Sequence, residues 1–165
     1  MLMKLIMVIM SNIDFTKNYQ QLQNSIINVN ASGGGDGPED VAWAIEMALN
    51  KSWKNNARFA ILIADAPCHG FQYHLSIFDD YPDGVPNRAN IEELIKEMAE
   101  IYISLFCMKI TNYTDIMYSK FQNIYNNYQS CEFRIIPLNS EESLSNIVVD
   151  SAVNVYIFQR NTKIR

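Results

Sequence analysis

The stretch RFAILIADAP, residues 58–67, constrains the fold more than any other part of this sequence. The residues from Phe59 to Ala64 are continuously apolar, and the run stops at Asp65. A half-exposed strand alternates apolar and polar residues, whereas an unbroken apolar run is typical of a strand buried on both faces of a parallel sheet. Because parallel strands need long crossover connections, usually helices, this stretch predicts an α/β domain.

The rest of the chain alternates between strand and helix patterns. Other apolar runs predict strands at residues 5–15, 101–108 and 133–138, the first as one strand or a broken pair. Apolar residues at helical spacing predict helices at residues 18–29, 38–52 and 113–128, and two more that follow Asn90 and Asn139. Short apolar strands that alternate with amphipathic helices predict a three-layer α/β domain with a mostly parallel sheet.

Length and charge narrow the function classes. The 165 residues fit a single domain spanning residues 1–165. The 18 acidic and 13 basic residues give a net charge of -5, which argues against a nucleic-acid partner because phosphates need a basic face. The apolar start, MLMKLIMVIM, is too short to cross a bilayer, and no other apolar run approaches that length, so we expect no transmembrane segment.

The three cysteines, Cys68, Cys107 and Cys131, are an odd number without close spacing. This pattern does not indicate a disulfide framework. We therefore expect a reducing compartment, the cytoplasm.

A glycine-rich turn, SGGGDGPED at residues 32–40, leads into the expected second helix. A phosphate site is disfavoured, because the turn lacks the Gly-Lys-Ser/Thr of a P-loop and carries acids that repel phosphate. Two interpretations stay open. Asp36 and Asp65 can hold a divalent cation from neighbouring loops at the carboxyl ends of the strands. Alternatively, Asp36 caps the helix with Glu39 as its partner, and Asp65 accepts hydrogen bonds from loop amides.

The long segment after the first apolar strand carries histidines and acids in DAPCHGFQYH and DDYPDG. A nucleophilic Cys68 with a histidine base and a zinc site of Cys68, His69 and His74 are both disfavoured, because no orienting acid, fourth ligand or usual spacing is evident. We expect instead that the histidines bind backbone carbonyls and order the loop. The acids Asp79, Asp80 and Asp83 lack the spacing of a calcium-binding EF-hand and favour a structural turn.

The segments GGGDGPEDVAWAIEMAL, ILIADAPCHGFQYH and DDYPDGVPN, in this order, resemble the von Willebrand factor type A domain. The resemblance is closest to the version found with atypical α-type protein kinases of protists. It is dense from about residue 14 to residue 90, while residues 1–12 diverge. It implies a doubly wound sheet with helices on both faces, in which the first strand and helix of the family are missing or replaced.

The resemblance also implies a functional site, the metal-ion-dependent adhesion site that binds protein partners through Mg²⁺ or Mn²⁺. Asp65 matches the acid of the third loop of that site, and Asp36 lies where the second loop usually has a threonine. The sequence contains no Asp-x-Ser-x-Ser, the motif of the first loop, so the resemblance implies weak or absent metal binding. The rim of the site would comprise His69, Asp79, Asp80 and Asp83.

These observations lead to one expected function and two alternatives. The expected function is a protein-interaction module with a degenerate metal site, taken from an α-kinase-type protein but without its catalytic region, and hence not an enzyme. One alternative is a metal-assisted hydrolase that uses the same acids, in which Asp65→Ala would abolish turnover. The other is a domain fragment without an independent function.

Overall fold

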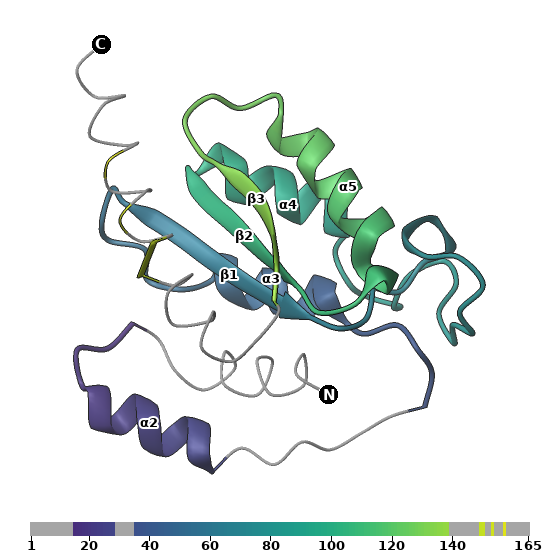
Figure 1. Ribbon diagram of the computed structural model, residues 1–165, viewed down its shortest axis with the longest axis horizontal. Coiled ribbons are helices and arrows are strands. Elements are labelled where there is room, and N and C mark those ends of the chain that lie inside the picture. The colour runs from purple at the N-terminus through teal and green to yellow at the C-terminus, as the bar shows by residue number, and fades with distance from the viewer. Residues whose placement is uncertain (1–14, 29–34, 139–148, 151–152, 154–156, 158–165) are drawn as a thin grey trace.

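The computed structural model describes residues 15–28, 35–138, 149–150, 153 and 157. Helices and strands follow one another along this part of the chain (Figure 1). They are α2 (Tyr19–Ile27), α3 (Val41–Leu49), β1 (Arg58–Ala64), the 3-10 turn η1 (Phe71–Tyr73), α4 (Ile91–Glu100), β2 (Ile103–Lys109), the 3-10 turn η2 (Asn112–Thr114), α5 (Asp115–Tyr125) and β3 (Phe133–Pro137).

The described strands form one parallel sheet in the order β1-β2-β3. In its register, Arg58 pairs with Ile103 and Leu105 pairs with Phe133. The central strand β2 is buried at every position from Ile103 to Met108. The three apolar runs at residues 58–67, 101–108 and 133–138 are therefore confirmed as parallel strands.

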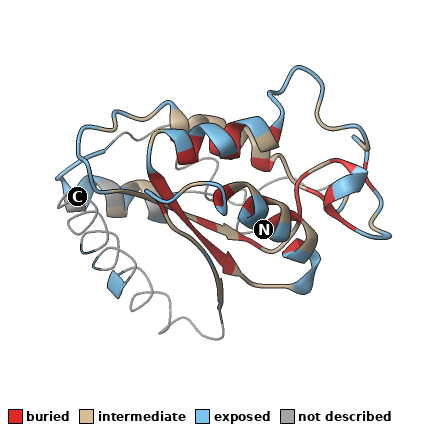
Figure 2. Ribbon diagram, turned by 90° about the horizontal axis from the view of Figure 1, so that it is seen from above, coloured by how far each residue is buried: buried red, intermediate tan, exposed pale blue. Residues whose placement is uncertain are grey.

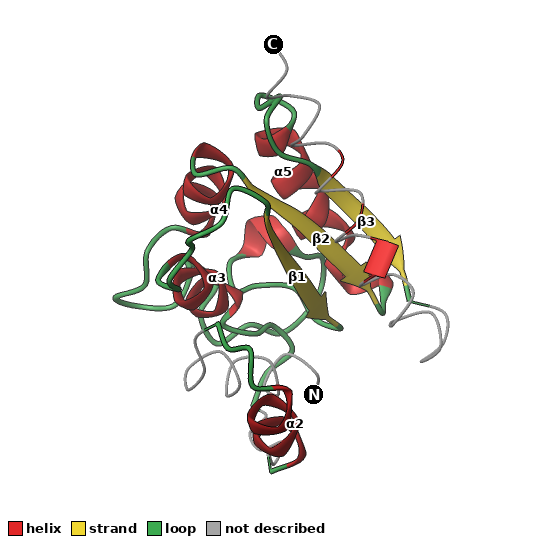
Figure 3. Ribbon diagram, turned by 90° about the vertical axis from the view of Figure 1, so that its left-hand side faces the viewer, coloured by secondary structure: helices red, strands yellow, loops and turns green. Residues whose placement is uncertain are grey.

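The helices α3, α4 and α5 cover one face of this sheet (Figure 3). Their apolar faces share a core with Leu62 of β1 and with Leu105 and Cys107 of β2. Figure 2 shows buried residues along the strands and on the inward sides of the helices. On the opposite face of β2, Ser104 and Phe106 are also fully buried. The α/β class is confirmed, with one layer of helices shown by the described residues.

Helix α4 begins where its sequence predicts. The side chain of Asn90 accepts hydrogen bonds from the backbone N–H groups of Glu92 and Glu93, at 2.9 and 3.4 Å. These bonds satisfy amides that have no partner inside the first turn of a helix. The four apolar residues expected to face inward, Ile91, Leu94, Ile95 and Met98, are all buried.

Helix α3 begins later than predicted. Pro38 was expected in its first turn, but the helix starts at Val41 and is capped by Asp40, whose Oδ1 accepts the Trp43 N–H at 3.0 Å. The reason lies in the preceding segment, because Glu39 donates its backbone N–H to the carbonyl of Pro67 at 2.9 Å and so stays extended. The interpretation of Asp36 as the helix cap is therefore wrong.

Tyr113 was also expected on the buried face of a helix, and this prediction is wrong. The helix α5 begins at Asp115, and Tyr113 lies in η2 with 63% of its surface exposed. Of the expected apolar positions in α5, Met117 and Phe121 are buried as predicted. The strand predicted at residues 5–15 lies almost entirely outside the described residues. Of the helix predicted after Asn139, only residues 149, 150, 153 and 157 are described, and they are helical.

The helix α2 lies within the range predicted at residues 18–29, away from the sheet (Figures 1 and 3). None of the helices in the described part of the chain is both long and apolar enough to cross a membrane.

Candidate functional site

The candidate site lies beyond the carboxyl ends of the parallel strands, where ligands of such sheets usually bind. Two segments build it, residues 35–40 before α3 and the loop of residues 66–84 after β1, which we call the rim loop. The rim loop extends away from the sheet (Figure 1). Its base is attached to the sheet edge, because the hydroxyl of Thr111, just after β2, donates to the backbone carbonyl of Asp65 at 2.5 Å.

Residues 35–40 pack tightly against the rim loop. The backbone N–H of Gly37 donates to the carbonyl of Phe78 at 3.3 Å. A Cβ atom on Gly37 would lie 2.2 Å from the Cγ2 of Ile77, far inside normal contact. At Gly35 the same atom would be 3.9 Å from its nearest neighbour, an Oδ2 of Asp80. Gly37 is therefore needed for close approach of the two segments, and this explains one glycine of the glycine-rich turn.

The carboxylate of Asp79 organises the rim loop. Its Oδ1 accepts from His69 Nδ1 at 2.7 Å and from the Tyr81 N–H at 2.8 Å. Its Oδ2 accepts from the Gly70 N–H at 2.8 Å and from His74 Nε2 at 3.0 Å. Two oxygens with two lone pairs each can accept four hydrogen bonds, so every lone pair of this carboxylate has a donor. One side chain thus connects residues on both sides of the turn.

Burial and hydrogen bonding act in opposite directions on Asp79. Its side chain is completely buried, and burial alone would raise the pKa of the carboxyl group. The hydrogen bonds from His69, Gly70, His74 and Tyr81 outweigh burial and hold the pKa of Asp79 well below its usual range. Asp79 is therefore a carboxylate throughout the physiological pH range.

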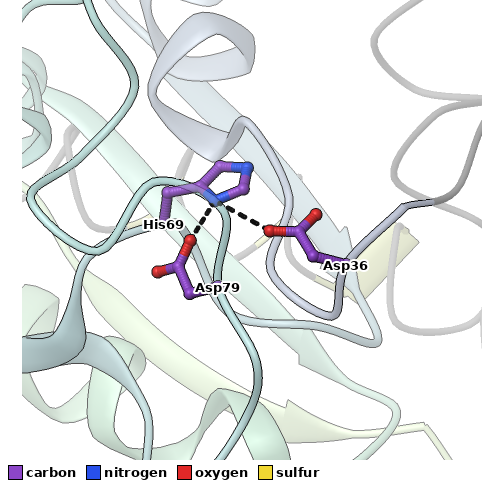
Figure 4. A group of neighbouring side chains, drawn as sticks. All are labelled: Asp36, His69 and Asp79. Atoms are coloured by element: carbon purple, nitrogen blue, oxygen red, sulfur yellow. Dashed lines mark hydrogen bonds and ion pairs between the residues drawn. The ribbon is translucent and has the colours of Figure 1, made fainter.

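A second carboxylate lies beside the His69–Asp79 pair. The Oδ2 of Asp36 is 3.6 Å from Nδ1 of His69 (Figure 4). The same oxygen accepts the backbone N–H of Asp80 at 2.8 Å. One ligand atom from each of Asp36, His69 and Asp79 lies within 4.8 Å of the others. Their side chains are 13%, 9% and 0% exposed. This sheltered Asp-His-Asp group can hold a metal ion.

The orientation of His69 follows from its partner. Its Nδ1 faces a carboxylate, which only accepts, so Nδ1 carries a proton. The ring Nε2 points away from both carboxylates (Figure 4). The edge of the ring also packs against Tyr81, with ring centroids 5.0 Å apart.

The other residues expected at the site lie around this group. Asp65 directly follows the last residue of β1, and its carboxylate is not a member of the Asp-His-Asp group. Asp80 contributes its backbone N–H to Asp36, while its side chain is exposed. Asp83 is exposed and lines a small cavity of about 190 Å³ together with His69 and Arg88. Arg88 itself is bound to Asp40, with Nε to Oδ2 at 2.8 Å.

Sequence reasoning missed the role of Asp79. We expected His69 and His74 to bind backbone carbonyls, and this is wrong because both bind Asp79. The proposed zinc combination with Cys68 is not assembled either: Cys68 lies in the core, where its N–H donates to the sulfur of Met117. A possible signal was two histidines followed within ten residues by an acid, but spacing alone does not select among Asp79, Asp80 and Asp83.

Cys68 is not suited to nucleophilic chemistry. It is 2% exposed, and burial raises the pKa of its thiol well above the usual value, so the sulfur stays protonated. Cys107 and Cys131 are buried as well, and all three cysteines are unpaired.

An apolar hollow of about 690 Å³ adjoins the Asp-His-Asp group. Its most prominent lining residues are Leu75, Phe78 and Tyr113, which are 76%, 73% and 63% exposed. Asp36 lies at its boundary. Large exposed apolar side chains gathered at one place are characteristic of binding surfaces.

The metal site implied by the family resemblance does not fit the residues of this chain. Mg²⁺ prefers octahedral oxygen coordination. The sequence has no Asp-x-Ser-x-Ser, and Asp65 does not share a ligand group with Asp36 in the described structure.

Comparisons with known proteins give a partial match. No family model matches the chain. The chain is similar to the alpha-protein kinase vwkA of Dictyostelium discoideum, with 35% identity over 97 residues. The match covers 58% of this chain and 15% of that protein. The chain is thus related in part to a protein named as an α-kinase, and the assignment to the von Willebrand factor type A family stays a prediction.

Proposed function

We propose that this chain is a von Willebrand factor type A-like interaction module that binds a protein partner at the carboxyl edge of its sheet. The observation that carries the proposal is the apolar hollow. More than half of the surface of Leu75, Phe78 and Tyr113 is exposed to solvent, although residues close to them in the sequence are buried in the core. Their placement beside Asp36 puts the hollow where ligands of parallel sheets bind.

The proposal includes the complete family architecture, a three-layer doubly wound sheet with a second helical layer on the other face of β2. The full burial of Ser104 and Phe106 on that face supports it. The partial match to vwkA supports a role as a kinase-associated module. The module acts by binding and not by catalysis, and its unpaired cysteines suit the cytoplasm.

The proposed binding surface combines the hollow with the acids of the rim. His69, Asp79, Asp80 and Asp83 shape the rim, and Asp65 and Asp36 give it negative charge. Any Mg²⁺ or Mn²⁺ that reaches Asp65 and Asp36 would bind weakly, because two carboxylates alone provide a small part of an octahedral shell. Binding of the partner is therefore expected to persist in a chelator.

Site-specific photocrosslinking tests the proposed surface. A photoreactive phenylalanine analogue replaces Phe78 in the full chain. In the matched control the analogue replaces Tyr102, which is 55% exposed and lies just before β2, at the amino end of that strand. In cells we expect one discrete protein adduct from position 78, none from position 102, and loss of the adduct when Leu75→Ser is added. Equal adducts from both positions, or insensitivity to Leu75→Ser, would contradict the proposal.

A further inference from the structure

We propose a binding site for a zinc-like divalent cation, formed by Asp36, His69 and Asp79. It differs from the Mg²⁺ site that the family resemblance implies at Asp65 and Asp36, and the two sites have only Asp36 in common. The site rests on the geometry of these three side chains and does not depend on the proposed partner. Their ligand atoms lie within 4.8 Å of one another, and none of the three is more than 13% exposed.

The group has the right number of lone pairs for a cation. Asp36 Oδ2 uses one lone pair on the Asp80 N–H, and Asp79 Oδ1 uses one on the Tyr81 N–H. Each oxygen can therefore direct its other lone pair at a cation. In the metal-free protein, this second lone pair of Asp79 Oδ1 accepts the proton of His69 Nδ1, at an N···O distance of 2.7 Å. A cation would take the place of this proton.

The exchange balances without any further reactant. When a cation binds Nδ1 of a neutral His69, the proton leaves Nδ1 and solvent returns one to Nε2, so no net proton is released. The position of Nε2, directed away from both carboxylates, leaves it able to carry the proton (Figure 4). His69 also lines the cavity of about 190 Å³, which has room for water beside the ring.

The surroundings hold the two carboxylates in place. Oδ2 of Asp79 is bound by Gly70 and His74, and such outer hydrogen bonds orient metal ligands. Among the described residues, the ion pairs of lysine and arginine involve other acids, such as Asp40, Glu92 and Asp115. No lysine or arginine in the described part of the chain thus neutralises Asp36 or Asp79, and a divalent cation would do so.

The ligand types determine the preferred ion. Imidazole nitrogen and carboxylate oxygen are both ligand types that Zn²⁺ takes, with bonds of about 2.0–2.2 Å, and three protein ligands leave a fourth position open to water. Mg²⁺ prefers an all-oxygen octahedron and loses its water reluctantly. The carboxylates need to move by less than about 1 Å, because tetrahedral ligands at these bond lengths lie about 3.4 Å apart.

Isothermal titration of the full chain with Zn²⁺ and with Mg²⁺ tests this site. The decisive variant is His69→Asn, since the asparagine amide can donate to Asp79 as Nδ1 does but offers no nitrogen lone pair. The matched control is Asp83→Asn, which removes an exposed rim acid outside the group. The absorption spectrum of bound Co²⁺ identifies the ligand type. Coordination by one of the buried cysteines would give an intense thiolate band, whereas the proposed site contains no cysteine.

We expect one Zn²⁺ per chain, Mg²⁺ bound at least about 100-fold more weakly, and no thiolate band. His69→Asn should weaken Zn²⁺ more than about 100-fold, above the 10–100-fold typical of an outer hydrogen-bond partner, while Asp83→Asn stays within about threefold. Zn²⁺ binding that survives His69→Asn, a thiolate band, or no binding at all would overturn the site. None of these results bears on the crosslinking from position 78, so the two proposals fail separately.

Discussion

The strand β2 and the rim loop differ in what holds them in place. Every side chain from Ile103 to Met108 is buried, and β2 has a hydrogen-bonded neighbour on each side. The rim loop instead exposes large apolar residues and is organised by the carboxylate of Asp79. Stability in β2 is therefore distributed over many apolar contacts, whereas in the rim loop it is concentrated in a few polar bonds.

This difference is compatible with the binding surface that we propose at the rim. A segment whose conformation depends on burial must keep its apolar residues inside. Because Asp79 fixes the rim loop through polar bonds, Leu75 and Phe78 can remain outside without loss of the fold. The same arrangement makes the loop sensitive to the loss of one residue, Asp79.

The largest expected effect on stability comes from replacing a phenylalanine by alanine in the core and, for comparison, in the rim loop. Phe121 of α5 is fully buried, and Phe78 of the rim loop is 73% exposed. Phe121→Ala should lower the free energy of unfolding by about 3–5 kcal/mol, because it removes buried surface and leaves a cavity. Phe78→Ala should change it by less than about 0.5 kcal/mol. Urea unfolding of both variants measures the difference, and equal losses would break the comparison.

The next effect concerns the carboxylate that holds the rim loop. Asp79→Ala leaves the donors on His69, Gly70, His74 and Tyr81 without their acceptor. We expect a loss of about 2–4 kcal/mol in the free energy of unfolding. Hydrogen exchange should show where the damage lies, with faster exchange of the rim-loop amides and unchanged exchange in β2.

The control for this variant is Asp83→Ala. Asp83 is exposed and accepts no hydrogen bond from another residue in the described part of the chain. It should unfold like the wild type, within about 0.5 kcal/mol. A rim loop that keeps its protection in Asp79→Ala would show that other contacts hold it.

A smaller effect is expected where the two segments of the site meet. Gly37→Ala places a Cβ atom 2.2 Å from Ile77 Cγ2, so the segments must separate at a cost of about 1–3 kcal/mol. Gly35→Ala has open space to 3.9 Å and should be tolerated. Thermal unfolding compares the two. Ile77→Ala removes the clashing methyl group, and the double variant should therefore lose less than the sum of the single variants.

The sequence predicted the sheet well because its signal is local. Residues 58–67, 101–108 and 133–138 each contain an apolar run of about the length of a strand, and the strand from the second run, β2, is buried along almost its whole length. The cap of α4 was equally local, because Asn90 binds amides two and three residues away. In both cases neighbouring residues contain the whole interaction.

The candidate site was predicted less well because it depends on contacts between distant segments. Asp36 meets the backbone of Asp80 across 44 residues, and this bond has no trace in the sequence pattern. The same reason explains the wrong start of α3, since Glu39 is kept extended by Pro67. The acids of the site were identified as candidates, but the central position of Asp79 required the folded loop.

The smallest expected effect is the pH dependence that Asp79 gives to stability. Its pKa lies below the usual range in the folded protein because four hydrogen bonds favour the carboxylate over the acid, while unfolding restores a pKa of about 3.9. The stabilisation is therefore complete above the unfolded value and is lost as the pH falls towards the folded one. Between pH 5 and pH 3, Asp79 should account for a loss of about 1.2 kcal/mol, which Asp79→Asn should not show. The difference between the urea-unfolding free energies of the two proteins over this pH range measures the contribution of Asp79. Parallel curves would mean that Asp79 does not carry the charge on which the rim loop depends.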